Sequence, residues 1–416
     1  MTWPLLPLKR SVDPARPITY GIVQAGPDTP GGVPYIRPTD MTQGSGVPDP
    51  TKLLHTTEEI AASYGRSRVA TGDIVVSIGP SYGKVMMVPE ALAGANLTQG
   101  TARVAAAAGI EGRFLYWTLQ TSLARKFWDA SVGGATFRAL NLEPLSRTPV
   151  PHVPLPQQRR IADFLDVETV RIDALIDARR RQVSVLDERL NSFREKLFGT
   201  DVTDGTPTPL MHLTDPYRPI VYGIVQAGPE VPEGVPYIKT GDLKKLHPSE
   251  LSRTSFAIHE QFRRAAVHPG DIVMAMRASI GAVALVPPEL PEANLTQGTA
   301  RIAAADGISA EWLLQALQTR HTREQCDLRA VGSTFRTLNI WDLRRIVLTA
   351  VSSEHQQVAL RRFGALQTKH HRVRQATQRQ LALLAERRTA LITAAVTGQF
   401  DVSTASGRNV TDGVNA

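Results

Sequence analysis

The sequence predicts an α/β (α+β) protein built from two similar modules, separated by two long helices that pack as an antiparallel coiled coil. The first observation behind this prediction is an internal repeat. Residues 95–103, Ala-Asn-Leu-Thr-Gln-Gly-Thr-Ala-Arg, recur unchanged as residues 293–301, and residues 17–41 share 17 of 25 positions with residues 219–243. The second is a long heptad-patterned segment that closes each repeat. Solenoid units span about 20–50 residues, so repeats this far apart should each hold their own core.

Composition and charge narrow the classes of function. The chain has 416 residues, a net charge of +8 and a pI near 9.7. A polyanion such as nucleic acid is therefore the first partner to consider, because clustered Lys and Arg raise the affinity for phosphates. Cys326 is the single cysteine, which excludes a disulfide framework and a cysteine-based zinc site. No signal peptide and no run of about 18 apolar residues are present, so we expect a cytoplasmic protein with no membrane partner.

Short strands punctuated by glycine and proline dominate the first part of each module. Residues 18–23 alternate like a strand, a Gly/Pro turn follows, and residues 33–36 form a second short strand. Residues 72–78 predict a turn that leads into an apolar strand, and residues 84–88 predict a further strand. The counterparts of these last two segments in the second module are residues 270–276 and 282–286.

A helix is predicted next in each module. Residues 114–128, matched by residues 312–326, have apolar positions at helical spacing and contain no proline. A glycine-containing turn follows the helix, at residues 132–134 and at residues 331–333. Each module is therefore expected to mix small sheets with helices.

Each module then ends in one long helix, over residues 157–198 and residues 354–396. Each would be a rod of roughly 60 Å at 1.5 Å per residue. Apolar positions step by threes and fours, with weaker positions at Arg179, His370, Thr377 and Arg388; they are Ile172, Leu175, Ile176, Val183, Leu186, Leu190, Phe193, Leu197, Phe363, Leu366, Val373, Leu381, Leu384, Leu391 and Ala395. A single heptad helix cannot hide its apolar stripe alone, and a whole module lies between the two, so we expect an antiparallel pair. The alternative is two unrelated amphipathic helices, each packed on its own module.

Motifs that carry catalysis are missing from the sequence. It has no Walker loop, no Gly-x-Gly-x-x-Gly turn, no His-Glu-x-x-His and no nucleophile elbow. Asp73 and Asp271 are duplicated carboxylates, but each follows a glycine and precedes an apolar strand, so turn capping is the favoured interpretation over a nuclease site. We expect the adjacent His370 and His371 to be solvated or part of the helix seam rather than metal ligands. The chain is expected to have no catalytic centre of its own.

The ends of the long helices carry a resemblance to a known family. The first helix begins with Pro-x-x-Gln-Gln-x-x-Ile-x-x-Phe-Leu, and the second ends with Ala-Val-Thr-Gly-Gln-Phe-Asp-Val at residues 395–402. With two modules each followed by a long helix, the chain resembles over its whole length the specificity subunit of type I restriction-modification enzymes. The second helix start departs from the pattern, with Phe363-Gly364 in place of Phe164-Leu165.

This resemblance implies a domain plan, partners and cofactors. Residues 1–155 and 201–353 would be target recognition domains that each read half of a bipartite site in double-stranded DNA. Residues 156–200 and 354–402 would be spacer helices. Residues 403–416, rich in Ser, Gly and Asn, are expected from composition to form a disordered tail. The partners implied are two modification (methyltransferase) subunits that methylate adenine after flipping it out of the duplex, and, in some systems, restriction subunits. S-adenosylmethionine, ATP and Mg would belong to those partners, and no cofactor or metal to this chain.

DNA reading needs side chains that hold phosphates and others that reach base edges, with Arg suited to guanine and Asn or Gln to adenine. Both modules supply these types in turn-rich segments. The candidate DNA contacts are Arg16, Tyr20, Gln24, Arg37, Asn96, Thr98, Gln99, Arg103, Thr136, Arg138, Arg218, Tyr222, Gln226, Lys239, Asn294, Thr296, Gln297, Arg301, Thr334 and Arg336. For each, solvated surface or backbone capping is the competing interpretation.

Near-identical modules related by an antiparallel helix pair should read near-identical half-sites in opposite orientation. The sequence thus predicts an interrupted, nearly palindromic target with half-site centres about one helical turn apart. One loop breaks the repeat: Gly79-Pro80-Ser81-Tyr82 stands against Arg277-Ala278-Ser279-Ile280, so one or two base positions are expected to differ. The alternatives are a stand-alone pseudo-dimeric DNA-binding regulator without modification subunits, and an enzyme that uses the duplicated aspartates.

Overall fold

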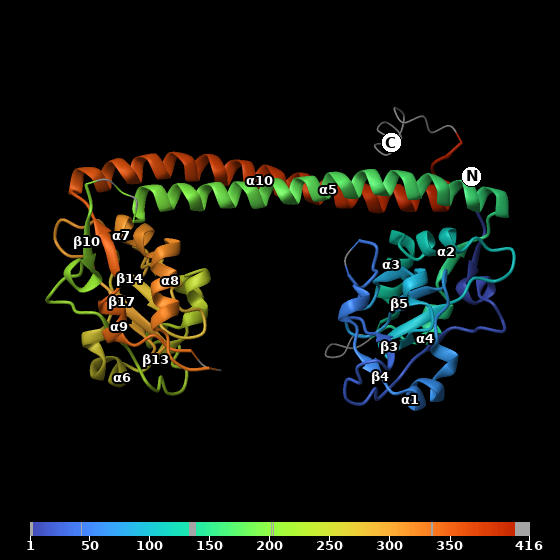
Figure 1. Ribbon diagram of the computed structural model, residues 1–416, viewed down its shortest axis with the longest axis horizontal. Coiled ribbons are helices and arrows are strands. Elements are labelled where there is room, and N and C mark those ends of the chain that lie inside the picture. The colour runs from blue at the N-terminus through green and yellow to red at the C-terminus, as the bar shows by residue number, and fades with distance from the viewer. Residues whose placement is uncertain are drawn as a thin grey trace. The chain divides into compact units, whose positions relative to one another are not determined.

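The computed structural model describes residues 3–42, 44–132, 139–200, 202, 204–333 and 336–403. The chain forms two compact units, the first made of Met1–Arg180 and Gln378–Ala416 and the second of Arg181–Thr377. Each unit contains one α/β module and a stretch of both long helices (Figure 1). This is the predicted fold class. Apart from Ser403, the tail predicted to be disordered lies outside the described residues.

The first module consists of short strands and helices that precede the first long helix. In chain order they are β1 (Leu5–Pro7), β2 (Thr19–Tyr20), β3 (Val33–Ile36), β4 (His55–Thr56), α1 (Glu58–Ser63), β5 (Ile74–Ser77), β6 (Val85–Met87), β7 (Asn96–Leu97), β8 (Thr101–Val104), α2 (Gly112–Thr118), α3 (Ser122–Ser131), α4 (Leu142–Ser146) and β9 (Pro149–Pro151). Short 3-10 turns connect several of them.

Strand β5 divides the core of the first module in two. It lies inside the antiparallel sheet β2-β8-β5-β6, beside a second sheet β4-β3-β7 in which β3 and β7 are parallel. Ile74 and Val76 pack into one buried cluster and Val75 into another. Successive side chains of a strand point to opposite faces, so three apolar residues in a row serve two cores. An uninterrupted apolar run is the pattern expected of a strand covered on both sides.

The second module repeats this arrangement. Its elements are β10 (Thr206–Pro209), β11 (Val221–Tyr222), β12 (Val235–Ile238), β13 (Arg253–Thr254), α6 (Phe256–Gln261), β14 (Ile272–Ala275), β15 (Val283–Leu285), β16 (Asn294–Leu295), β17 (Thr299–Ile302), α7 (Ala310–Leu317), α8 (Arg320–Arg329), α9 (Ile340–Arg344) and β18 (Val347–Ala350). The sheets have the orders β11-β17-β14-β15 and β13-β12-β16. Strand β14 again serves two clusters, with Met274 in one and Val273 in the other.

One predicted helix in each module is in fact two. The segment expected to be continuous over residues 114–128 breaks between α2 and α3, and its counterpart breaks between α7 and α8. Thr121 ends the first helix by donating its hydroxyl to Thr118 O at 2.7 Å, and it begins the second by accepting from Ala124 N at 3.1 Å. Thr319 repeats the hydroxyl contact with Ala316 O at 2.7 Å. A threonine at this position is an N-cap, which apolar spacing alone does not reveal.

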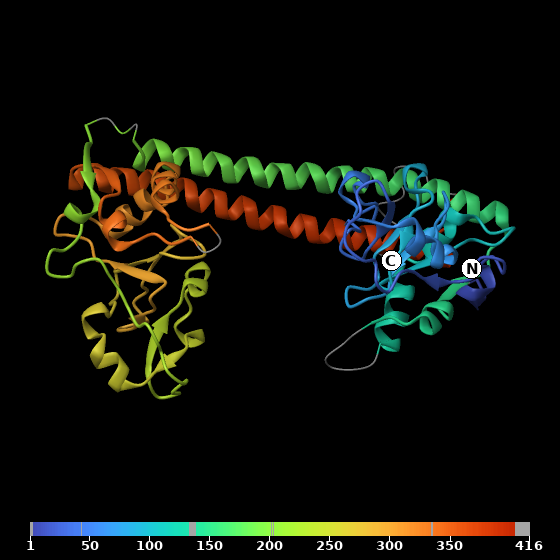
Figure 2. The same ribbon diagram turned by 60° about the horizontal axis from the view of Figure 1, so that its bottom comes forward.

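The long helices are α5 (Leu155–Phe198) and α10 (Ser353–Thr397), and they run side by side in both units (Figures 1 and 2). In the first unit, Arg388 of α10 pairs with Asp173 of α5 at 2.9 Å, and the rings of Phe164 and Phe400 lie 5.6 Å apart. Residue numbers rise along one helix as they fall along the other. The pairing is therefore antiparallel in this unit, as predicted. Leu175 of α5, expected in the seam beside Ile176, is instead 52% exposed, because Ile172 and Ile176, four residues apart, take the inner face of the helix.

The second unit shows the same direction of pairing. His370 of α10 contacts Asp187 of α5 at 2.8 Å, and the rings of Phe198 and Phe363 lie 5.4 Å apart in an edge-to-face arrangement. His370 thus belongs to the seam, as expected, and it faces an aspartate rather than a metal site. No helix among the described residues is long and apolar enough to cross a membrane.

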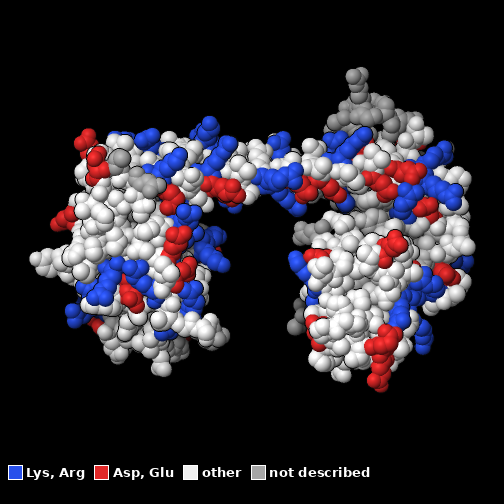
Figure 3. Space-filling view, in the orientation of Figure 1, with Lys and Arg blue, Asp and Glu red and all other residues white. Residues whose placement is uncertain are grey.

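Seam positions of α10 are buried or half-buried at every predicted step. These positions include two polar residues, Thr377, which is buried, and Arg388, which is half-buried. The Thr377 hydroxyl donates to Val373 O at 2.9 Å and Arg388 is neutralised by Asp173, so both polar groups are satisfied in the seam. On the outer face, Figure 3 shows Lys and Arg interspersed with Asp and Glu along the long helices.

Candidate nucleic-acid interface

Backbone hydrogen bonds bring four distant segments of the first module side by side. Gln99 N donates to Ile22 O at 2.9 Å, and Ile78 N donates to Gly100 O at 2.7 Å. Leu140 N then donates to Ile78 O at 2.8 Å. The segments thus follow one another in the order 20–24, 98–100, 78–79 and 140. We call this set the reading edge of the module.

The second module has the same reading edge, built from residues 222–226, 296–298, 276–277 and 337–338. Gln297 N donates to Ile224 O at 2.8 Å, Met276 N to Gly298 O at 2.8 Å, and Leu338 N to Met276 O at 2.9 Å. The unchanged nine-residue repeat lies within this framework in both modules. Its identity is therefore part of a shared backbone scaffold.

Glycine is required where the first two segments of each edge meet. A Cβ atom at Gly21 would lie 1.9 Å from Leu97 O, and one at Gly223 would lie 2.0 Å from Leu295 O. No side chain fits at such distances, so these glycines allow the two backbones to approach. This close backbone contact explains why the Tyr-Gly-Ile-Val-Gln segment has a glycine at its second position in both repeats.

The reading edges present an exposed tyrosine and exposed glutamines. Tyr20 is 46% exposed and Tyr222 is 49% exposed, although large aromatic side chains are usually covered. Gln24 and Gln226 are exposed as well. These residues offer an apolar ring and an amide with both donors and acceptors, the combination that can contact base edges.

The turn at the centre of each edge differs between the modules in exposure. Gln99 is exposed, whereas Gln297 is half-buried. Thr98 and Thr296 are both half-buried, and the Thr98 hydroxyl donates to Ile36 O at 3.4 Å. The glutamine side chain is thus the group that each turn offers to a ligand, while the threonine helps to hold the turn.

Two candidate arginines are clamped by the duplicated aspartates. Arg16 donates to both oxygens of Asp73 at 2.8 and 2.5 Å, and Arg218 makes the same pair of bonds to Asp271. Asp73 also accepts from Ala70 N at 2.7 Å, and Asp271 from His268 N at 2.8 Å.

These bonds confirm the turn-capping prediction for both carboxylates. The two aspartates are 3% and 2% exposed and their oxygens are occupied by an arginine and the turn backbone, which disfavours the nuclease interpretation.

Three further candidates on the surface also have partners within the protein. Arg37 is half-buried and forms a bidentate pair with Asp40, with Arg37 Nη2 at 2.7 Å from Asp40 Oδ1. Asp40 raises the pKa of Arg37 through this hydrogen bond. Lys239 is exposed and donates to Ser252 Oγ at 2.7 Å, and the exposed Arg336 bonds to the backbone carbonyl of Asp327.

Four candidate DNA contacts lie in the interior instead, which corrects the expectation that they face a ligand. Asn96 and Asn294 are fully buried, and Arg103 and Arg301 are 5% and 4% exposed. The Arg103 guanidinium donates to Arg68 O at 2.9 Å, and burial lowers its pKa, as it does for Arg301.

The Asn96 amide donates to Ala61 O at 3.2 Å, while Asn294 contacts His259 Nδ1 at 3.1 Å. These side chains tie backbone segments together within their modules. The remaining candidates Thr136, Arg138 and Thr334 lie outside the described residues.

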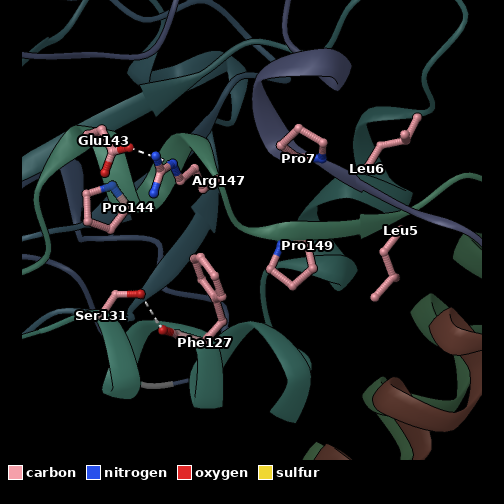
Figure 4. Close-up of a pocket in the computed structure, with 9 residues that line it drawn as sticks. All are labelled: Leu5, Leu6, Pro7, Phe127, Ser131, Glu143, Pro144, Arg147 and Pro149. Atoms are coloured by element: carbon pink, nitrogen blue, oxygen red, sulfur yellow. Dashed lines mark hydrogen bonds and ion pairs between the residues drawn. The ribbon is translucent and has the colours of Figure 1, made fainter.

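A hollow beside β1 and β9 is a second place where a ligand could fit. It has a volume of about 610 Å³ and is lined by Leu5, Leu6, Pro7, Phe127, Ser131, Glu143, Pro144, Arg147 and Pro149 (Figure 4). The charged pair in its wall is already neutralised, since Arg147 Nε lies 2.6 Å from Glu143 Oε1. The Ser131 hydroxyl likewise donates to Phe127 O at 2.7 Å. Such a lining offers few polar groups to a ligand, so the reading edges are the stronger candidate site.

Comparison with known proteins gives one family and several relatives. Residues 24–183 match the family model described as the type I restriction modification DNA specificity domain. The type I restriction enzyme EcoBI specificity subunit of Escherichia coli is 24% identical over 283 residues, which are 61% of this chain and 58% of that protein. The match therefore spans little more than half the length of this relative.

One solved structure shares the fold over almost the whole chain, and a second is similar at a lower score. One, described as the structural basis underlying complex assembly and conformational transition of the type I R-M system, has a TM-score of 0.70 at 19% identity and covers 96% of this chain and 98% of the other. The crystal structure of the HsdS subunit from Thermoanaerobacter tengcongensis has a TM-score of 0.48 at 18% identity, with 96% and 97% covered.

Proposed function

We propose that the chain, whose residues 24–183 match the type I restriction modification DNA specificity domain, is a specificity subunit of such a system. Its two reading edges would each read one half of a bipartite site in double-stranded DNA. The chain would direct adenine methylation, and restriction where such subunits exist, by partner subunits. The observation that carries the proposal is the duplicated reading edge, which presents Tyr20 and Gln24 in one module and Tyr222 and Gln226 in the other.

Chemistry at the edges and the overall charge both support DNA as the ligand. Glutamine amides match the donor and acceptor pattern of adenine, and tyrosine rings offer apolar contact to bases. The net charge of +8 supplies long-range attraction to phosphates. Non-specific binding is therefore expected to weaken as salt rises, while the choice of sequence is set by the edges.

Apolar residues on the outside of the long helices support modification subunits as partners. Val167, Val170, Leu175 and Val185 of α5 and Leu383 of α10 are exposed. A stand-alone regulator would gain nothing from apolar side chains on a helix pair that already has its own seam, whereas docked subunits would cover them. This observation favours the specificity subunit over the stand-alone regulator.

For domain bounds, cofactors and partners, we propose what the sequence predicts. Recognition domains would span residues 1–155 and 201–353, and spacer helices residues 156–200 and 354–402. The chain itself would carry no catalytic centre, cofactor or metal, while S-adenosylmethionine, ATP and Mg would act in partner subunits in the cytoplasm. Because the two modules repeat each other and the helices pair antiparallel in both units, we propose a nearly palindromic, interrupted site.

Deletion of the gene followed by a genome-wide map of adenine methylation tests this function. Methylation is expected to disappear at one interrupted motif whose two halves are near-identical in inverted orientation, and to return when the gene is restored. Two unrelated half-sites would overturn the palindrome. An unchanged methylation map, together with sequence-specific binding by the purified chain, would instead support the regulator.

A further inference from the structure

The two reading edges differ most at one position, where Gly79 of the first module is replaced by Arg277 in the second. Both residues directly follow the residue that bonds to the central turn, Ile78 after β5 in one module and Met276 after β14 in the other. The backbone frameworks match, so the guanidinium is an addition to an otherwise repeated scaffold. It is also the largest chemical difference between the two edges.

Local backbone geometry holds Arg277 in place at the edge. Ala278, the next residue, has φ = +58°, in the left-handed region that non-glycine residues rarely adopt. Its counterpart Pro80 cannot adopt this φ, because the proline ring fixes φ near −65°. A β-bridge between Arg277 and Thr337 fixes the other side of the residue. Unusual backbone conformations of this kind gather at functional sites, where the surrounding structure maintains them.

The Arg277 side chain lies beside the glutamine at the centre of the edge. Arg277 Nη1 is 3.4 Å from Gln297 Oε1, a long hydrogen bond that places the two side chains next to each other. Gln297 is half-buried, whereas Gln99, whose module has Gly79 at the position of Arg277, is exposed. The second module thus presents an Arg-Gln pair where the first presents a glutamine alone.

Arg277 is available for a ligand in a way that other edge arginines are not. Among the described residues no carboxylate forms an ion pair with it, whereas Arg16, Arg37 and Arg218 are each clamped by an aspartate. Arg277 is exposed, and a guanidinium carries five N–H donors, of which one is used weakly by Gln297.

We propose that Arg277 is a specificity-determining residue that makes bidentate hydrogen bonds to the O6 and N7 atoms of a guanine, at the base pair next to the one contacted by Gln297. Arginine to guanine is the most common specific contact in the major groove. The half-site of the second module therefore requires a guanine that the half-site of the first module does not. This asymmetry rests on the proposed DNA-reading function and defines where the nearly palindromic site departs from symmetry.

Selection of bound sequences from randomised duplex DNA tests the inference. The full chain, with any methyltransferase that co-purifies with it, is compared with Arg277→Gly, which copies the first module, and with Arg277→Lys, which keeps the charge but loses the bidentate geometry. Arg263→Ala removes an exposed arginine of the same module as a matched control. Unfolding midpoints of all variants are measured alongside.

The wild-type chain should enrich two half-sites that differ at one guanine. Arg277→Gly should lose the preference at that base pair alone and lower the affinity for the preferred site by about tenfold or more, with Arg277→Lys close to it and Arg263→Ala unchanged. The inference is overturned if Arg277→Gly keeps the wild-type preference, weakens all sequences equally, or alters only the base assigned to Gln297. If the wild-type chain enriches no sequence, the proposed function itself fails.

Discussion

The carboxamide of Gln158 joins the start of α5 to the backbone of Glu111. Its Oε1 accepts from Glu111 N at 2.8 Å, and its Nε2 donates to Val153 O at 2.7 Å. Gln356 repeats the contact at the start of α10, with Ser309 N at 2.8 Å. Both side chains are buried. Gln158, the second glutamine of the first Gln-Gln pair, and Gln356, the first glutamine of the second pair, therefore each fasten a long helix to its module.

Replacement of Gln158 by Leu should destabilise the first unit. Leucine leaves the buried Glu111 N–H and Val153 carbonyl without partners, so the free energy of unfolding should fall by about 1–3 kcal/mol. Urea denaturation followed by circular dichroism measures the change. Gln157→Leu on the same turn is the matched control and should have a smaller effect. Equal stability of the Gln158 variant and the wild type would contradict the anchoring role.

Replacement of Asp73 by Asn should lower the stability of the first unit without lowering the methylation rate of the complex. The neutral amide weakens the bidentate pair with Arg16 and the cap on Ala70 N. Since Arg16 is about one-third exposed, the expected loss is about 1–3 kcal/mol, less than for a fully buried pair. Asp271→Asn should cost a similar amount in the second unit.

Methylation assays on the co-purified complex provide the second readout for these two variants. Whatever fraction remains folded should support the wild-type rate. Abolished turnover in a variant that is folded at wild-type level would favour the enzyme interpretation of the duplicated aspartates.

Exchange of Tyr20 or Tyr222 for Ala should weaken DNA binding with little effect on folding. Both rings are about half exposed on the reading edges, so their removal leaves no cavity. We expect a loss of affinity of about tenfold for each variant on the natural site, since an aromatic contact to a base is worth about 1–3 kcal/mol. Fluorescence anisotropy with a labelled duplex measures it.

Phe256→Ala is the control for these tyrosine variants, because Phe256 is an exposed aromatic residue of α6 and belongs to neither edge. Its DNA affinity should equal that of the wild type. If both tyrosine variants also bind as tightly as the wild type, the reading edges are not where this chain meets DNA.

Cys326 should be inert in the folded protein. Burial raises the pKa of its thiol to about 12, so at pH 8 the thiolate is present at only roughly one part in ten thousand. Iodoacetamide should leave the native chain unmodified over the time in which it fully alkylates the chain in denaturant, as read by intact mass. Rapid native alkylation at pH 8 would show that α8 opens readily. Reactivity is expected to rise only as the pH approaches the raised pKa.

Periodicity along the chain determined the architecture of this protein. The repeat showed two modules, and heptad spacing identified the positions of α10 that the structure buries against α5. These features are local in sequence, because side chains at helical spacing share one face whatever the rest of the fold does. The family resemblance rested on the same kind of signal, a short pattern at the start of a helix.

Tertiary structure alone decided which polar side chains face outward. Strand β8 is buried on both faces, so alternation along the strand did not reveal that Arg103 points inward to Arg68 O. The pair between Arg16 and Asp73 joins residues 57 positions apart, which no local pattern encodes. Gln99 and Gln297 lie in identical nine-residue segments, yet they differ in exposure, and only Gln297 has Arg277, 20 residues away in the chain, beside it. The exposure of a side chain depends on which distant segments pack against it. In each module, backbone hydrogen bonds across the reading edge hold those segments together.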